Sequence, residues 1–434
     1  MALAGPSLVE NLLVSLVSMV DLMMVGSLGA PAVAAVGLSN HPIMFFQAVF
    51  IALNVGTTAL VARLTGAGDR ATASEAARQT LVVSLLVGLT MGTLAMVNAR
   101  HVLALMGAAP EVLPGGIRYF QAVGAGLAFN AMAMNMSATL RGSGDTRTPM
   151  QVNTIANLCN VTGNYVLIYG MLGFPALGVF GAGIATSIAR LISCTLLGRR
   201  LFSGSCRIHI SFRRRYRPDW ELLRRVLRVG APTAGEQFVL RGGQVTFLRV
   251  VSTLGTSTIA AHQIGMNILN MTFMIGQAFG VAATTLVGQG LGARDPARAE
   301  AAARTASRLG MIFAGILAGG FFFFGRQLAW LYTRDAAVIG QTALALRIYA
   351  PAQPAQSTRF VLAGALRGAG DTRWPLYATA VGVWGFRVLL AATLIQGLGW
   401  GLAGAWVAIA TDQVARALVI VRRFNAGRWK AARV

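Results

Sequence analysis

Four carboxylic acids lie in stretches of sequence that are otherwise apolar and long enough to cross a membrane. They are Glu10, Asp21, Glu236 and Asp412. An ionisable side chain inside a bilayer costs a few kcal/mol or more, so each acid is a candidate functional group. Asp412 lies four residues before Arg416 on the same helical face, which predicts an ion pair. Asp21 has no comparable partner, because Arg190 is the only arginine within an apolar stretch of the first half.

Four asparagines give the stretch 150–171 a polar stripe. They are Asn153, Asn157, Asn160 and Asn164. Their 4-3-4 spacing places them on one face of a helix. At a rise of about 1.5 Å per residue, Asn160 and Asn164 lie about 15 and 21 Å from the expected cytoplasmic surface. By the same count Thr186 lies about 18 Å and Asp21 about 24 Å in, so their oxygen atoms reach similar depths.

Carboxylate, amide and hydroxyl oxygens are ligands that suit a hard cation, and an unpaired carboxylate can also take up a proton. We therefore predict a cation-coupling site that uses Na⁺ or H⁺, with no other cofactor. Its predicted members are Asp21, Asn157, Asn160, Asn164 and Thr186. The alternative interpretation is structural, with the asparagines joining helices and holding Asp21 by hydrogen bonds.

The composition indicates which elements position these residues. Of the 434 residues, 55% are hydrophobic and 12% are charged, and the mean hydropathy is +0.62. Soluble domains carry about 25% charged residues, so we predict an all-α polytopic membrane protein. The twelve predicted transmembrane helices are 5–26, 41–62, 81–98, 119–139, 150–171, 178–198, 231–251, 265–288, 309–324, 348–365, 376–396 and 402–421.

A tandem repeat with an offset of 226 residues organises the chain. The segment L-R-G-S-G-D-T-R-T-P at 140–149 returns as L-R-G-A-G-D-T-R-W-P at 366–375. The register holds without a gap from residue 6 to residue 190, which indicates that one six-helix unit occurs twice. We predict two six-helix bundles, 1–200 and 229–434, joined by a basic connector at 201–228.

The polar stripe and its acid are not repeated. Asp21 maps onto Phe247, and Asn160 and Asn164 map onto Phe386 and Leu390. The fold itself therefore does not require them. Glu10 and Glu236, in contrast, occupy matched positions, each four residues after a proline near the expected cytoplasmic end of a span. This repetition favours a structural or gating role, with contact to substrate or a proton as the alternative.

Basic residues explain the net charge of +23. The loops after even-numbered spans and the C-terminal tail hold 26 of the 37 Lys and Arg residues, and the loops after odd-numbered spans hold five. This bias follows the positive-inside rule and not the pattern of a nucleic-acid surface. It places both termini and the connector in the cytoplasm. The run Arg213–Arg215 anchors that topology or binds anionic lipid headgroups.

No enzyme motif is found in the sequence, and we predict that the protein is not an enzyme. The four histidines are scattered. The glycine-rich runs lack the Lys-Ser/Thr ending of a phosphate-binding loop, and the three cysteines show no metal-ligand spacing.

Several sequence motifs are shared with a known family. They are V-D-L-M-M-V-G-S-L-G at 20–29, the two L-R-G-x-G-D-T-R-x-P turns, T-I-A-A-H-Q-I at 258–264 and N-V-T-G-N-Y-V-L-I-Y-G at 160–170. Together they resemble the multidrug and toxic compound extrusion (MATE) family over nearly the whole chain. The resemblance implies two six-helix bundles around a central cavity. It also implies export of drugs or toxic metabolites coupled to entry of Na⁺ or H⁺.

The resemblance also implies roles for particular residues. In the family, an acid on the first helix and a polar pair on the fifth helix form the cation site, and these match Asp21, Asn160 and Asn164. Some members carry Asp where Asn164 stands, so this chain has one charge fewer. Another branch uses acids on the seventh and tenth helices. Glu236 lies near the former, but the tenth span offers Gln353 and Gln356. We treat Gln356, with Glu10 and Glu236, as a substrate or gating candidate.

We therefore expect a secondary multidrug antiporter of the bacterial inner membrane that exports amphipathic, often cationic compounds by alternating access. We expect a monomer among membrane lipids that binds small molecules and no nucleic acid. One alternative is a lipid-linked precursor flippase of the same superfamily, which more often has fourteen spans. The other is a non-transporting membrane scaffold, which the near-absence of soluble domains disfavours.

Overall fold

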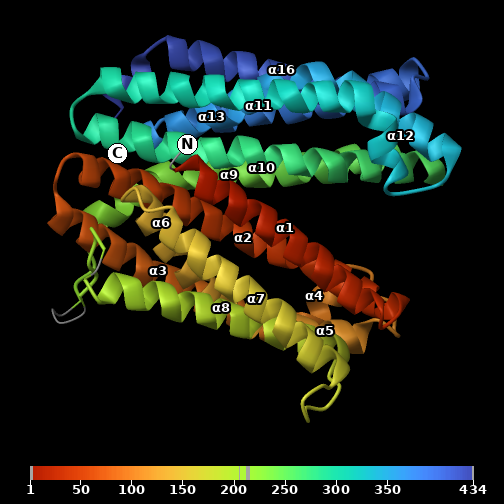
Figure 1. The fold of residues 1–434 in the computed structure, drawn as a ribbon, viewed down its shortest axis with the longest axis horizontal. Coiled ribbons are helices and arrows are strands. Elements are labelled where there is room, and N and C mark those ends of the chain that lie inside the picture. The colour runs from red at the N-terminus through yellow and green to blue at the C-terminus, as the bar shows by residue number, and fades with distance from the viewer. Residues whose placement is uncertain (1–2, 205, 212–215, 433–434) are drawn as a thin grey trace. The chain divides into compact units, whose positions relative to one another are not determined.

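Each half of the duplicated sequence folds into a helical unit of its own, unit 1 over Met1–Leu227 and unit 2 over Arg228–Val434. The structure is a computed structural model that describes residues 3–204, 206–211 and 216–432. Every regular element in these ranges is a helix, which confirms the predicted all-α class (Figure 1). The run Arg213–Arg215 lies outside the described residues.

Among the described residues, seven of the helices α1 to α8 make up the six spans of unit 1. The fourth predicted span consists of two helices, α5 and α6, separated at Gly126. A short helix, α4, precedes them and is not among the predicted elements. The helices are α1 (Ala4–Gly26), α2 (Ala30–Gly66), α3 (Arg70–Val97), α4 (Ala99–Leu105), α5 (Leu113–Ala125), α6 (Leu127–Gly142), α7 (Arg147–Tyr169) and α8 (Gly178–Phe202).

Unit 2 repeats this plan. Its fourth span is also divided, into α12 and α13 with the short 3-10 helix η1 between them. Its fifth span contains two π-helical stretches, η2 and η3. The elements are α9 (Trp220–Ser252), α10 (Thr256–Gly292), α11 (Pro296–Trp330), α12 (Ala336–Tyr349), η1 (Ala350–Ala352), α13 (Gln353–Ala369), α14 (Arg373–Ala380), η2 (Val381–Leu389), α15 (Leu390–Ala392), η3 (Thr393–Gly397), α16 (Gly401–Asn425) and η4 (Arg428–Ala431).

Equivalent helices keep the offset of 226 residues at their ends. Helices α2 and α10 begin and end at equivalent positions, and α3 and α11 begin at equivalent positions. Asp69 caps α3 by accepting from the Thr72 N–H at 3.0 Å, and Asp295 caps α11 by accepting from the Arg298 N–H at 2.8 Å. The hydrogen bonds from the backbone and side chain of Thr72 lower the pKa of Asp69. The sequence repeat is therefore also a structural repeat.

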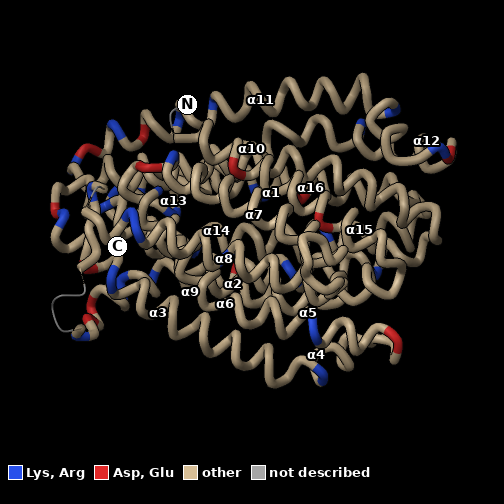
Figure 2. Tube along the Cα trace, turned by 60° about the horizontal axis from the view of Figure 1, so that its bottom comes forward, with Lys and Arg blue, Asp and Glu red and all other residues tan. Residues whose placement is uncertain are grey.

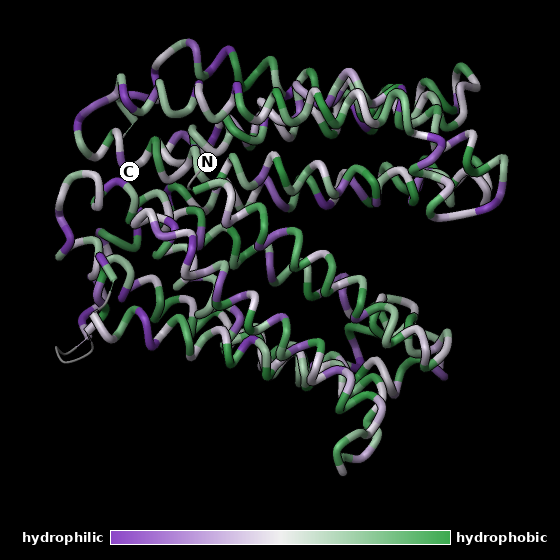
Figure 3. The backbone as a smooth tube through the Cα atoms, viewed as in Figure 1, coloured by the Kyte–Doolittle hydropathy of each residue, from purple (hydrophilic) through white to green (hydrophobic). Residues whose placement is uncertain are grey.

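Eight segments within the described residues are long and apolar enough to cross a membrane. They are α1, α2, α3, α8, α10, α11, the segment Arg373–Gly397 and α16. The other four predicted spans are helical too, but two are divided into short pieces, and α7 and α9 carry more polar residues. Hydrophobic residues run along the helices of each unit (Figure 3), and Lys and Arg gather towards one end of them (Figure 2). The chain is a multi-pass membrane protein.

Glycine and threonine bring the second and fourth spans of each unit into close contact. In unit 2, a Cβ atom at Gly368 would lie 2.2 Å from the backbone oxygen of Thr284. Thr284 Oγ1 donates to the backbone oxygen of Gly364 at 2.8 Å. The equivalent bond in unit 1 runs from Thr58 Oγ1 to the oxygen of Ala138 at 3.1 Å. Such close approach stabilises helix pairs in lipid, where little hydrophobic driving force acts between helices.

We expect Gly368→Ala to destabilise the protein, because the added methyl group meets backbone atoms of α10. Overpacking of this kind costs about 1–3 kcal/mol. Gly340→Ala is the matched control, because a Cβ atom there has nothing within 4 Å. Thermal unfolding of the purified protein in detergent measures both changes. Equal melting temperatures for the two variants would contradict the close contact.

Candidate functional site

Asp21 on α1 faces α7 and is in no ion pair among the described residues. Asn164 Nδ2 donates to Asp21 Oδ1 at 2.6 Å. Asn160 and Asn164 are 5% and 1% exposed, whereas Asp21 is partly exposed. Arg190 donates instead to the backbone oxygen of Val123 at 3.2 Å. An amide therefore holds the carboxylate, and no guanidinium of the described residues forms an ion pair with it.

The Asn160 amide is a second group that holds the carboxylate. Its Nδ2 lies 3.1 Å from both carboxylate oxygens of Asp21, and its Oδ1 accepts from the Thr186 N–H at 3.3 Å. Asn160 and Asn164 therefore both direct an amide NH₂ group at Asp21.

Asn164 and Thr186 supply further oxygen atoms. Asn164 Oδ1 is buried and has no hydrogen-bond partner within the described part of the chain. An unsatisfied buried acceptor costs about 1–3 kcal/mol, which a ligand that binds oxygen would recover. Thr186 Oγ1 donates to the Ala182 oxygen at 2.9 Å and keeps lone pairs for another contact.

Among the described residues, no group of three or more His, Cys, Asp or Glu could hold a metal. The oxygen set suits Na⁺ or a proton.

The predicted asparagine stripe divides between two sites. Its two later members lie at Asp21, whereas Asn153 Nδ2 donates to Glu10 at 2.5 Å. The Asn153 oxygen accepts from Ser193 Oγ at 3.0 Å. Asn157 lies between these sites along the helix, and its buried Nδ2 has no partner among the residues described. Its place in a cation site therefore stays a prediction.

Glu10 and Glu236 each form an ion pair with an arginine from the repeated turn motif. Arg141 Nη2 lies 2.6 Å from Glu10, and Arg367 Nη2 lies 2.6 Å from Glu236. Thr379, which stands at the position equivalent to Asn153, adds a hydrogen bond of 3.2 Å to Glu236. Sequence reasoning treats the motifs only as turns and misses these pairs. The shared offset of both arginines and both glutamates is the signal that could have found them. The geometry favours the structural role.

Unit 2 has a buried acid where unit 1 has a threonine. Asp412, at the position equivalent to Thr186, is fully buried and lies 2.6 Å from Nη2 of both Arg387 and Arg416. The predicted pair of Asp412 and Arg416 is confirmed. Arg387 is a second partner, from η2, that sequence spacing does not show.

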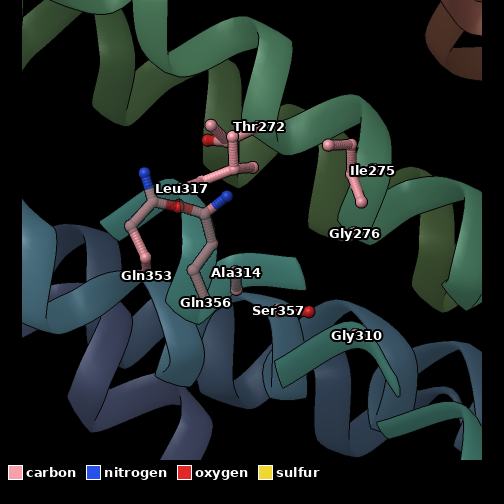
Figure 4. Close-up of a pocket in the computed structure, with 9 residues that line it drawn as sticks. All are labelled: Thr272, Ile275, Gly276, Gly310, Ala314, Leu317, Gln353, Gln356 and Ser357. Carbon is pink, nitrogen blue, oxygen red and sulfur yellow. The ribbon is translucent and has the colours of Figure 1, made fainter. Parts of the chain in front are cut away.

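Gln356 lies at a small pocket enclosed by α10, α11 and α13 of unit 2 (Figure 4). Gln353 and Gln356 project into it towards Thr272, and both are 1% exposed. Gln356 also contacts the hydroxyl group of Tyr349. A substrate can therefore reach Gln356 only after this part of the unit opens, and its predicted substrate or gating role stays a prediction.

Two repeated helical units of membrane-crossing length, with buried polar groups at unequal positions, define a polytopic membrane transporter. The MatE family model matches residues 6–166 and 232–393, once in each half. The chain belongs to the MATE family of transporters, whose fold has twelve transmembrane helices in two bundles.

Two curated relatives show how far the similarity extends. The chain is 31% identical to "Probable multidrug resistance protein NorM" of Thermotoga maritima, over 99% of this chain and 92% of the relative. It is 28% identical to "Multidrug resistance protein MdtK" of Yersinia pseudotuberculosis, over 99% of this chain and 94% of the relative. A solved outward-facing conformation of a multidrug resistance MATE family transporter shares the fold. It has a TM-score of 0.92 and 24% identity, and the match covers 98% of this chain and 95% of that one. The predicted fold class and family are confirmed.

Glu10→Gln should destabilise the protein, because it removes the charge that faces the Arg141 guanidinium. Breaking a buried pair costs about 3–5 kcal/mol, and we expect about half of that because the Arg141 side chain is 25% exposed. Glu300→Gln is the control, because Glu300 pairs with the more exposed Arg304 and Lys430 and such pairs contribute about 0–1 kcal/mol. Thermal unfolding compares the two variants. A loss no larger for Glu10→Gln than for Glu300→Gln would argue against a structural ion pair.

Proposed function

We propose that the protein exports amphipathic, often cationic compounds in exchange for Na⁺ or H⁺ bound at Asp21. The observation that carries this proposal is a carboxylate held by amides, beside the buried and unpartnered Oδ1 of Asn164 among the described residues. A bound cation would supply both the counter-charge of Asp21 and a partner for that oxygen. The names of the multidrug resistance relatives support drugs or toxic metabolites as substrates.

Neutralisation of Asp21 is the step that would couple ion entry to export. With the site empty, Asp21 carries a negative charge that the amides of Asn160 and Asn164 hold, and a bound ion would balance that charge. The two states differ in charge and in hydrogen bonding between α1 and α7, so they stabilise different conformations of an alternating-access cycle. One charge that crosses a potential of about 100 mV supplies about 2.3 kcal/mol, which bounds the work per ion before any concentration term.

We also propose a monomer in the bacterial inner membrane, with both termini and the 201–228 connector in the cytoplasm. The gathering of Lys and Arg towards one end of the helices of each unit supports this orientation (Figure 2). Residues 1–200 and 229–434 would then be bundles of the same orientation, as an even number of spans in each requires.

Asp21→Asn should abolish ion-driven efflux while leaving folded protein in the membrane, because Asn cannot change its charge. The measurement is dye export from proteoliposomes under an imposed Na⁺ gradient or an imposed pH gradient. Asp335→Asn is the control, because Asp335 caps α12 and Asn caps a helix equally well. Export by the Asp21 variant at the wild-type rate under both gradients would refute coupling at this residue. The gradient that drives the wild-type protein identifies the ion.

Asn164→Leu should weaken ion binding about tenfold or more, because a charge-assisted contact contributes about 1.5–3 kcal/mol. Leucine is the residue that unit 2 carries at the equivalent position, Leu390, so the repeat already accommodates it. The readout is the ion concentration that gives half-maximal export. Thr162→Val, at an exposed position of the same helix, is the control. An unchanged half-maximal concentration for Asn164→Leu would remove that residue from the site.

A further inference from the structure

Three arginines of unit 2 place more positive charge inside the protein than the acid among them balances. Arg359, Arg387 and Arg416 are 8%, 6% and 2% exposed, and they come from α13, η2 and α16. Arg387 and Arg416 share one carboxylate, Asp412. Arg359 is in no ion pair with any described residue, and its Nε donates to Gln413 Oε1 at 3.0 Å. Three cations thus surround a single anion.

Other groups of unit 2 do not restore the balance. Glu236, the other buried acid among the described residues of this unit, also acts electrostatically on Arg359 and Arg416, but it is paired with Arg367, so four arginines share two carboxylates. His262 and Tyr349 both pack against Trp406 and carry no negative charge at neutral pH. Buried Nε atoms of Arg387 and Arg416 also lack a partner within the described residues. Burying net positive charge inside a membrane costs free energy, so a cluster of this kind indicates a functional site.

The repeat indicates that the fold does not need two of these three arginines, because only Arg416 has an arginine, Arg190, at its equivalent position in unit 1. The positions equivalent to Arg359 and Arg387 in unit 1 are Ala133 and Val161. Unit 1 forms the equivalent spans without these two arginines, the fifth of them as one continuous α-helix, α7. Arg387 also lies in the π-helical stretch η2, and such stretches occur frequently at functional sites.

Donor groups also lie on α13, the helix that carries Arg359. Gln353, Gln356 and Arg359 recur every three residues, so they lie on one side of that helix. Gln353 Nε2 and Ser357 Oγ are buried, have no partner among the described residues, and line the pocket drawn in Figure 4. The pocket measures about 10 Å³, which is about the room that one water molecule needs. Amide and hydroxyl groups can donate hydrogen bonds to an anion.

We propose that unit 2 contains an anion site in which Arg359, Arg387 and Arg416 bind one monovalent anion, either a carboxylate or chloride. Guanidinium groups match the geometry of a carboxylate and are less strongly hydrated than an ammonium group, which suits a buried site. Where the anion is the carboxylate of an exported zwitterion, the inference rests on the proposed function. Where it is chloride, the inference is independent of that function.

Anion-dependent stability of the full-length protein in nanodiscs tests the site. The melting temperature is measured in potassium isethionate, with potassium chloride or potassium acetate added at constant ionic strength. We expect it to rise with the added anion, because a ligand that binds the folded state stabilises it. Arg359→Gln should weaken the apparent affinity about tenfold or more. Arg359→Lys should retain part of the response, and Arg326→Gln, at an exposed position of α11, should retain all of it.

The outcomes separate the two sources of the anion. A response to chloride alone identifies a free counter-ion, and a response to acetate identifies a carboxylate site; either supports the proposal. A wild-type protein that responds to neither anion overturns it, as does an Arg359→Gln variant with wild-type affinity. If Arg359→Gln does not fold, the wild-type titration and Arg359→Lys decide. Cation-driven export of an amphipathic dye is measured in parallel. Its failure, with the anion response intact, counts against the proposed function alone.

Discussion

The cost of burying charge is the constraint on which this structure depends. Among the acids placed in apolar stretches, Glu10, Glu236 and Asp412 each lie 2.6 Å from an arginine. These pairs allow ionisable groups to remain within helices that cross a membrane. Asp21 is the exception within the described residues, since amides hold it in place of a guanidinium. Because no arginine of the described residues neutralises the Asp21 carboxylate, a bound cation or proton would change its charge.

The duplication separates what the fold requires from what function requires. Both units keep the helix caps, the close contact between second and fourth spans, and the ion pair between a first-span glutamate and the turn arginine. They differ in polarity at the deeper level, where Thr186 in one unit corresponds to Asp412 in the other and Val161 corresponds to Arg387. Shared features therefore hold each bundle together, and the unshared ones give the units different binding chemistry.

The repeat and the apolar periodicity were sufficient to predict the helical class and the positions of the spans. Counting depth along helices also brought Asp21, Asn160 and Asn164 to one level, as the structure has them. Hydropathy could not predict the break at Gly126, because apolar residues continue through it. The pairing of Glu10 with Arg141 joins residues 131 positions apart, and helical spacing carries no information about such contacts.

The register between the first and fifth spans determines which unit would respond to an ion in the proposed exchange. In unit 1, α1 and α7 are joined by Asn153 to Glu10 and by Asn164 to Asp21, and both contacts join residues 143 positions apart. The first contact includes the permanent charge of Arg141, so that end is held whatever is bound. The second depends on the charge of Asp21. In unit 2 the same offset joins Thr379 to Glu236, but the deeper position is filled by Phe247, which belongs to the hydrophobic core, and by Leu390, which packs against that core. An apolar contact does not change with ion occupancy, so any ion-driven rearrangement between the first and fifth spans must begin in unit 1, at the end that Asp21 controls.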